Sequence, residues 1–196
     1  MLKALLALLL LVPAYALAGN GPFGFEPGMK LEELKKIAKL TQKRDFVYST
    51  DKAPSGHSAF EEYRVLVTPQ HGLCKIMAWT PEITTGAYGE GVKDKFDTLS
   101  EGLTAKYGKS KKFDYLKSGS IWDEPRDWMM SLFKDERVLS ALWSRESGSE
   151  LPDTLESVDL EATGFDSGSA MIVLSYYFRN SDACIDWIKA QENSAL

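Results

Sequence analysis

The chain has 196 residues, of which 44% are hydrophobic, 11% aromatic and 26% charged, and its formal net charge is −5. This composition is too apolar and too aromatic for a disordered chain, and two cysteines are too few for a disulfide-dense scaffold. The acidic balance does not suggest the basic patch that nucleic-acid-binding proteins show, so we expect no nucleic-acid partner.

Residues 1–18 have the pattern of a secretory signal peptide. Lys3 precedes an apolar run from residue 4 to residue 12, Pro13 follows, and Ala16-Leu17-Ala18 supplies the small side chains that a signal peptidase requires. Cleavage after Ala16 is the second choice. The apolar run is shorter than the roughly 20 residues of a membrane-spanning helix. We therefore expect a periplasmic or secreted protein, no stable transmembrane segment after cleavage, and one domain over residues 19–196.

The first half of this domain alternates between helical and strand-like patterns. Residues 19–28 are rich in glycine and proline, and residues 29–40 place apolar side chains at helical spacing. Strand-like runs follow at 45–49, 60–68 and 72–80, separated by a loop at 51–58 and a turn at 69–72. A loop over 81–91 leads into a second helix over 92–107, which ends at Gly108.

The second half contains a helical turn or two within 125–134, strands at 138–144, 155–162 and 170–179, and a final helix that Ser181 can cap. The run at 170–179 is apolar on both faces, so we place it centrally in the sheet. The sequence shows no clear internal repeat. The pattern predicts an α+β fold in which an antiparallel or mixed sheet packs against two to four helices.

Cys74 and Cys184 are the two cysteines of the chain. Cys74 lies in the predicted strand 72–80, and Cys184 lies near the start of the predicted C-terminal helix. Because an oxidising compartment permits a bridge, we predict a disulfide between them; two buried free thiols are the alternative. A redox role is disfavoured because there is no C-x-x-C motif.

The histidines give little support for catalysis. His57 lies in the polar loop 51–58 together with aspartate and serine, but neighbours in a loop rarely adopt the geometry of a catalytic triad. The sequence has no G-x-S-x-G motif. His71 looks like a hairpin-turn residue, and the strand-like run at 60–68 separates it from His57 by far more than a coordination sphere. We expect no metal site and no cofactor.

Acids and aromatics cluster at one place, where Asp123 and Glu124 lie beside Trp122 and Trp128. Such a cluster suits carbohydrate binding, but we favour the alternative that Trp122 and Trp128 close the core beneath a loop. The glycines of 86–91 match neither a dinucleotide fingerprint nor a P-loop, so they indicate a turn that enters a helix. The basic run of Lys106, Lys109, Lys111 and Lys112 suits an anionic surface or a solvated helix end.

The segment Phe23-Gly24-Phe25-Glu26-Pro27-Gly28-Met29 resembles an F-G-F-x-x-G-M lead-in that follows the signal peptide in small exported bacterial proteins of unknown function. Those chains have serine or threonine where this one has Lys30, so we expect the capping box of the following helix to be lost. The resemblance implies an exported bacterial α+β protein, and it carries no catalytic residue with it.

We expect a non-enzymatic exported protein that binds an unknown protein or small molecule through its sheet face or loops. The candidate binding residues are Trp122, Asp123, Trp128 and His57, and no residue is assigned a catalytic role. One alternative is a hydrolase whose site is assembled from loop residues such as His57 or Asp123 and Glu124. Another is an envelope-associated structural factor that uses the lysine run.

Overall fold

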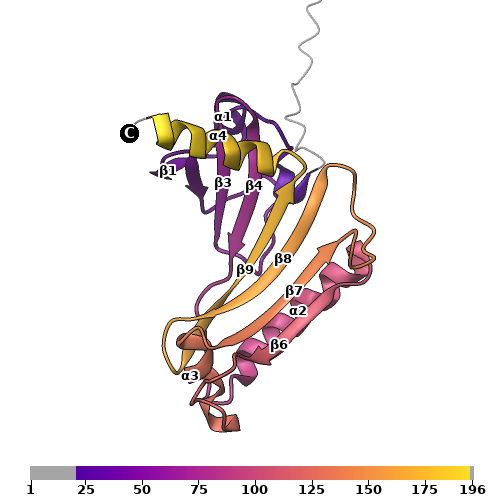
Figure 1. The fold of residues 1–196 in the computed structure, drawn as a ribbon. Coiled ribbons are helices and arrows are strands. Elements are labelled where there is room, and N and C mark those ends of the chain that lie inside the picture. Colours follow the sequence, from indigo (N-terminus) through magenta and orange to yellow (C-terminus); the bar gives the residue numbers. More distant parts are fainter. Residues whose placement is uncertain (1–20, 195–196) are drawn as a thin grey trace, which may run out of the picture.

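The structure, a computed structural model, describes residues 21–194, and the predicted signal peptide lies outside them (Figure 1). The fold is α+β, as the sequence predicts. In chain order the elements are η1 (Pro22–Gly24), α1 (Leu31–Ile37), β1 (Thr41–Arg44), β2 (Val47–Thr50), β3 (Glu62–Thr68), β4 (Gly72–Trp79), β5 (Ile83–Thr84), α2 (Glu90–Tyr107), β6 (Lys111–Leu116), η2 (Pro125–Asp127), α3 (Trp128–Phe133), β7 (Arg137–Ser144), β8 (Leu155–Gly164), β9 (Ser169–Phe178) and α4 (Ser181–Ser194).

The strands form one antiparallel sheet in the order β1-β2-β3-β4-β9-β8-β7-β6, and β5 also pairs with β9. Each half of the chain is a helix followed by a four-strand meander: α1 precedes β1–β4, and α2 precedes β6–β9. The two halves meet where β4 pairs with β9, which we call the seam. The strand order is therefore symmetric about the seam, although the sequences of the two halves show no repeat.

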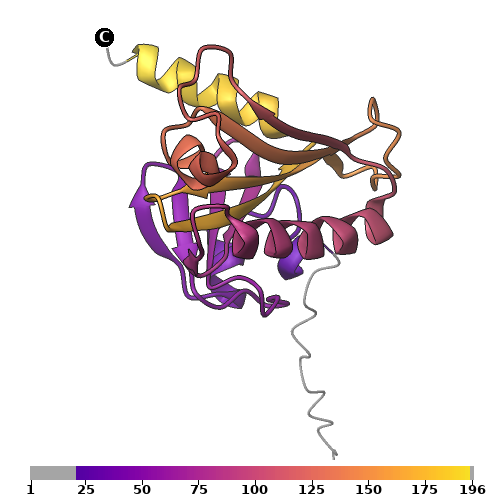
Figure 2. The same cartoon turned by 90° about the horizontal axis from the view of Figure 1, so that it is seen from below.

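The main core lies on one face of the sheet. Helix α2 buries Val92, Phe96, Leu99, Leu103 and Tyr107 at the spacing that the sequence predicts. These side chains join one hydrophobic cluster with Leu34 of α1, Met129 of α3 and inward residues of both meanders, and this continuity makes the two halves a single domain. Helix α4 lies on the opposite side of the sheet from α2 (Figures 1 and 2).

Several elements differ from the prediction. Strands β1 and β6 were not predicted; neither contains a buried residue. The first helix spans Leu31–Ile37 rather than 29–40. The strand predicted at 45–49 begins at Val47, because Phe46 adopts a positive φ of 62° in the turn between β1 and β2.

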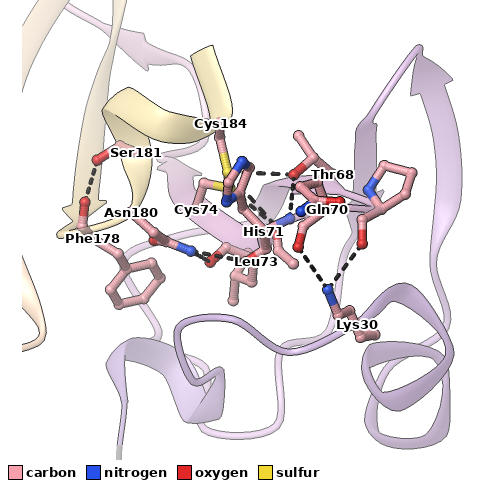
Figure 3. The surroundings of a disulfide bond; sticks show 12 residues. Lys30, Thr68, Gln70, His71, Leu73, Cys74, Phe178, Asn180, Ser181 and Cys184 are labelled. Carbon is pink, nitrogen blue, oxygen red and sulfur yellow. Dashed lines mark hydrogen bonds between the residues drawn. A yellow bond between two sulfur atoms is a disulfide. The ribbon is translucent and has the colours of Figure 1, made fainter. Parts of the chain in front are cut away.

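The expectation that the capping box of α1 is lost is only partly right. The Lys30 backbone N–H donates to the Glu33 carboxylate at 2.7 Å, so this half of the capping box is present. A lysine side chain has no acceptor for the reciprocal bond. Instead the Lys30 ammonium donates to the carbonyls of Pro69 and Gln70, at 2.9 and 3.0 Å, in the turn between β3 and β4 (Figure 3).

The predicted Cys74–Cys184 disulfide is present, with a Cα–Cα distance of 6.4 Å. Cys74 is the unpaired residue of a β-bulge, because Leu66 pairs with Lys75 while Val67 pairs with Leu73. Asn180 donates to the carbonyls of His71 and Leu73, each at 3.0 Å, just before α4 begins (Figure 3). The start of α4 is therefore fixed to β4 by a covalent bond and by two hydrogen bonds, and His71 lies in the hairpin turn as predicted.

Candidate functional site

A cavity of about 470 Å³ lies between η1, the loop that precedes β3, and the C-terminal half of α2. Its interior is formed by buried, mostly apolar side chains, and its rim by exposed residues. The interior residues are Phe60, Leu99, Leu103, Leu174 and Tyr176, and the exposed lining residues are Ser55, Gly56, His57, Thr98, Gly102 and Lys106. This volume falls within the range of small-molecule sites.

The F-G-F lead-in builds one wall of this cavity. Phe23 has a positive φ of 56°, and its ring lies edge-on to those of Tyr63 and Tyr176, with centroids 4.8 and 5.6 Å away. Gly24 has a φ of 80°, and a Cβ there would lie 2.9 Å from the Cβ of Pro54. The motif thus folds η1 against the loop, where the Ser55 N–H donates to the Phe23 carbonyl at 3.0 Å.

His57 lies at the rim, in a loop that Tyr63 fixes. The Tyr63 hydroxyl accepts from the His57 backbone N–H at 2.8 Å and donates to the His57 carbonyl at 3.1 Å. Burial raises the pKa of this hydroxyl, so it stays protonated and able to donate. The Ala59 N–H donates to His57 Nδ1 at 3.1 Å, which places the proton of the neutral imidazole on Nε2. His57 therefore offers an N–H donor at the cavity.

The electrostatic character of the lining is neutral to positive. Burial, with a contribution from Tyr107, raises the pKa of Tyr176, so the floor carries an un-ionised phenol. No aspartate or glutamate is among the residues of 21–194 that line the cavity, although the chain as a whole is acidic. His57 and Lys106 are the lining groups that can carry a positive charge.

The structure does not bring the other predicted site residues to this cavity. Trp128 is buried in α3, where Lys93 lies 4.5 Å from its ring and where a Cβ on Gly89 would clash with it. These contacts lie at the start of α2, whereas the cavity lies beside residues 98–106, about 7 Å or more further along the helix axis. Of the two tryptophans expected to close the core, Trp128 does so, and Gly89 of the glycine-rich segment accommodates its ring.

Trp122 and Asp123 lie in the loop between β6 and η2. Trp122 is half-buried and Asp123 is exposed, while Glu124 pairs with Arg126 at 2.8 Å. No ring contact joins Trp122 to Trp128 in the part of the chain that the structure describes. The acid and aromatic cluster of the sequence is therefore spread over a loop and a buried helix.

The cavity also contains residues that the sequence analysis did not single out. Gly102 is an interior residue of α2, and a Cβ there meets no atom within 4 Å. A glycine inside a helix lowers the stability of the helix by about 1 kcal/mol relative to alanine. Its presence within the predicted helix is therefore the feature of the sequence that could have pointed to a cavity beside α2. Leu174 and Tyr176 are read from the sequence only as apolar strand residues.

Residues 21–194 contain no group of three or more histidine, cysteine, aspartate or glutamate side chains that could hold a metal ion. No helix within the same residues combines the length and the apolar character needed to cross a membrane. Comparisons of the chain with protein-family models, with curated proteins and with solved structures found no match.

Proposed function

We propose that this chain is an exported, non-enzymatic binding protein that holds a small amphipathic molecule in the cavity. The main observation that supports this proposal is a cavity of about 470 Å³ that has an apolar interior and no lining carboxylate among the described residues. The pattern of residues 1–18 supports export, and the Cys74–Cys184 disulfide suits an oxidising compartment.

The chemistry of the lining defines the ligand class. Interior side chains such as Leu99, Leu103 and Leu174 favour an apolar body, because burial of apolar surface contributes roughly 25 cal/mol per Å². His57 Nε2–H and the Lys106 ammonium at the rim favour a hydrogen-bond acceptor, above all an anionic one. A molecule with a hydrocarbon or aromatic body and a carboxylate or sulfonate end matches both parts.

A hydrolase at this site has no observation in its favour. In the described residues, the only hydrogen bond of the His57 ring is the one it accepts from the Ala59 N–H. Neither a serine hydroxyl nor a carboxylate is bonded to the ring, as a triad would require.

Gly102 supplies a variant that separates binding from stability. Gly102→Leu would narrow the cavity mouth, where a side chain has free space, and would remove the helix penalty of glycine. We expect the variant to be as stable as the parent or up to about 1 kcal/mol more stable. We expect its affinity for the ligand to fall about tenfold, a loss of roughly 1.4 kcal/mol.

The measurement is a titration with anilinonaphthalene sulfonate, which has an aromatic body and an anionic end, followed by displacement with a long-chain carboxylate. Glu101→Leu is the matched control, because Glu101 is exposed on the same turn of α2 but does not line the cavity. Saturable binding that Gly102→Leu weakens and Glu101→Leu preserves supports the proposal. Equal binding by all three proteins, or none by the parent, contradicts it.

A further inference from the structure

The two walls of the cavity differ in chemical character. The side formed by η1, the loop before β3 and strand β9 carries four rings, which we call the ring wall: Phe23, His57, Phe60 and Tyr176. On the side formed by α2, the lining within residues 21–194 consists of aliphatic and polar side chains around Gly102, and no ring is among them. The cavity is therefore aromatic on one side only.

The ring wall is a continuous series from the exposed rim to the buried floor. The centroid of the His57 ring lies 5.8 Å from that of Phe60, which lies 5.7 Å from that of Phe23. The Phe23 centroid lies 5.6 Å from that of Tyr176. The Phe23 ring meets those of Phe60 and Tyr176 edge-on, at interplanar angles of 74° and 86°. Because aromatic rings attract one another in this arrangement, the wall is ordered by its own contacts before a ligand arrives.

Gly102 shapes the opposite wall. Thr98, Gly102 and Lys106 are spaced by four residues, so they lie along one side of α2. Thr98 and Lys106 are exposed, whereas Gly102 has no side chain, and a Cβ at Gly102 would meet no atom within 4 Å. The lining of α2 therefore has a recess between two side chains, and a thin, flat body can approach the helix there.

We propose that the ligand of the cavity is an aromatic carboxylate, whose flat ring system lies between the ring wall and Gly102 and whose carboxylate lies at the rim. There the His57 Nε2–H and the Lys106 ammonium are the available donors. This inference rests on the proposed function and narrows the ligand class that the proposed function gives.

The ring wall favours an aromatic body over a flexible hydrocarbon chain. A ligand ring gains contacts with the edges and faces of Phe23 and Phe60 in addition to the apolar area that it buries. A chain gains only from the buried area and loses rotational freedom when it binds. Aromatic walls also hold organic cations, but a cation is disfavoured here, because Lys106 lies at the rim and no carboxylate lines the cavity within the described residues.

The test compares 2-naphthoate with decahydro-2-naphthoate, which has the same carbon skeleton and the same charge but no aromatic ring. Each compound displaces anilinonaphthalene sulfonate from the oxidised parent protein, from Phe60→Leu and from Phe133→Leu. The measured quantity is the ratio of the two dissociation constants in each protein, so a general loss of affinity cancels. Phe60→Leu removes a ring of the ring wall, whereas Phe133→Leu is the matched control, because Phe133 is 38% exposed in α3 and does not line the cavity.

We expect the parent protein to bind 2-naphthoate about fivefold more tightly than the saturated compound. Phe133→Leu should keep this ratio, and Phe60→Leu should lower it to about twofold or less. Nuclear Overhauser contacts between 2-naphthoate and the Phe23 ring of the parent protein give a readout that needs no variant. If Phe60→Leu does not fold, the parent ratio and these contacts decide.

Three results would overturn the inference: equal or weaker binding of 2-naphthoate by the parent protein, an unchanged ratio in folded Phe60→Leu, or no Overhauser contact with the ring wall. The failure of this inference differs from the failure of the proposed function. A long-chain carboxylate that still displaces the probe, in a way that Gly102→Leu weakens, leaves the proposed function standing while the aromatic preference falls. If no carboxylate displaces the probe from the parent protein, both are wrong.

Discussion

Asp159 occupies a position on the sheet that is costly for an ionised carboxyl. It lies between Ser175 and Leu142 in the register, where burial, together with the charge of Glu161, raises its pKa to about 6. Lys75 acts in the opposite direction but does not offset the burial. Near neutral pH the folded protein therefore holds a carboxylate that the unfolded chain would solvate better.

The sign of the resulting pH dependence follows from this raised pKa. The Asp159 contribution to stability is fully present below the unfolded pKa near 4, and it is lost as pH rises through about 6. Asp159→Asn removes the ionisation, so the variant should be more stable than the parent at pH 8 by about 1–2 kcal/mol, after allowance for solvent screening. At pH 4 the difference should be close to zero.

Urea denaturation of both proteins at pH 4, 6 and 8 measures this difference. Glu156→Gln is the control on the same strand, because Glu156 is exposed and pairs with Arg179 at 3.5 Å. A constant offset between Asp159→Asn and the parent at all three pH values would contradict the assignment of the titration to Asp159.

Among the elements, α4 depends most on a few attachments at one end. Within the helix only Ser181 and Cys184 are buried, and Trp187 and Ile188 are half-buried. The Ser181 hydroxyl donates to the Phe178 carbonyl, and the disulfide follows one turn later. The remaining contacts with the sheet are limited, so the bond to Cys74 carries much of the attachment.

Replacing both cysteines by serine should therefore lower the stability of the protein and loosen α4. The bond closes a loop of sequence separation 110, for which chain-entropy reasoning gives an upper figure of about 4–5 kcal/mol. Urea midpoints and hydrogen exchange of residues 185–194 measure the two effects. The fully reduced parent protein should match the double variant, and an unchanged midpoint in both would show that packing alone fixes α4.

The elements show which parts of the fold the sequence could predict. Helix α2 and strand β9 carry their own apolar patterns, so their positions follow from the residues themselves. Strands β1 and β6 lack buried side chains and exist because β2 and β7 supply hydrogen-bond partners. The fold class was therefore predictable from the buried elements, whereas the full width of the sheet was not.

The candidate site was harder to predict from the sequence than the fold, because it too depends on contacts between distant segments of the chain. The cavity joins Phe23, His57, Gly102 and Leu174, which come from four separate segments of the chain. Local patterns identified His57 as a loop residue and residues 19–28 as a segment rich in glycine and proline, but their convergence depends on how the two meanders meet.

At the scale of the whole molecule, the seam unites the two halves. Ile76 faces Tyr176 and Ala78 faces Leu174 across it, and these buried residues belong to the same core cluster as the inward side of α2. The cavity takes its floor from β9, one wall from η1 and the loop before β3, and another from α2. Both halves therefore contribute to the ligand site, and neither contains it alone.

This arrangement predicts that the halves unfold together. If one core extends across the seam, losing either meander exposes the apolar face of the other, so partly folded forms should be scarce. Native-state hydrogen exchange at increasing urea, read by mass spectrometry, should give the same opening free energy for β3 in the first half and β8 in the second. The far end of α4, with few buried side chains, serves as the internal control and should open at lower free energy. Strand β3 opening well before β8 would show instead that the meanders are separate folding units.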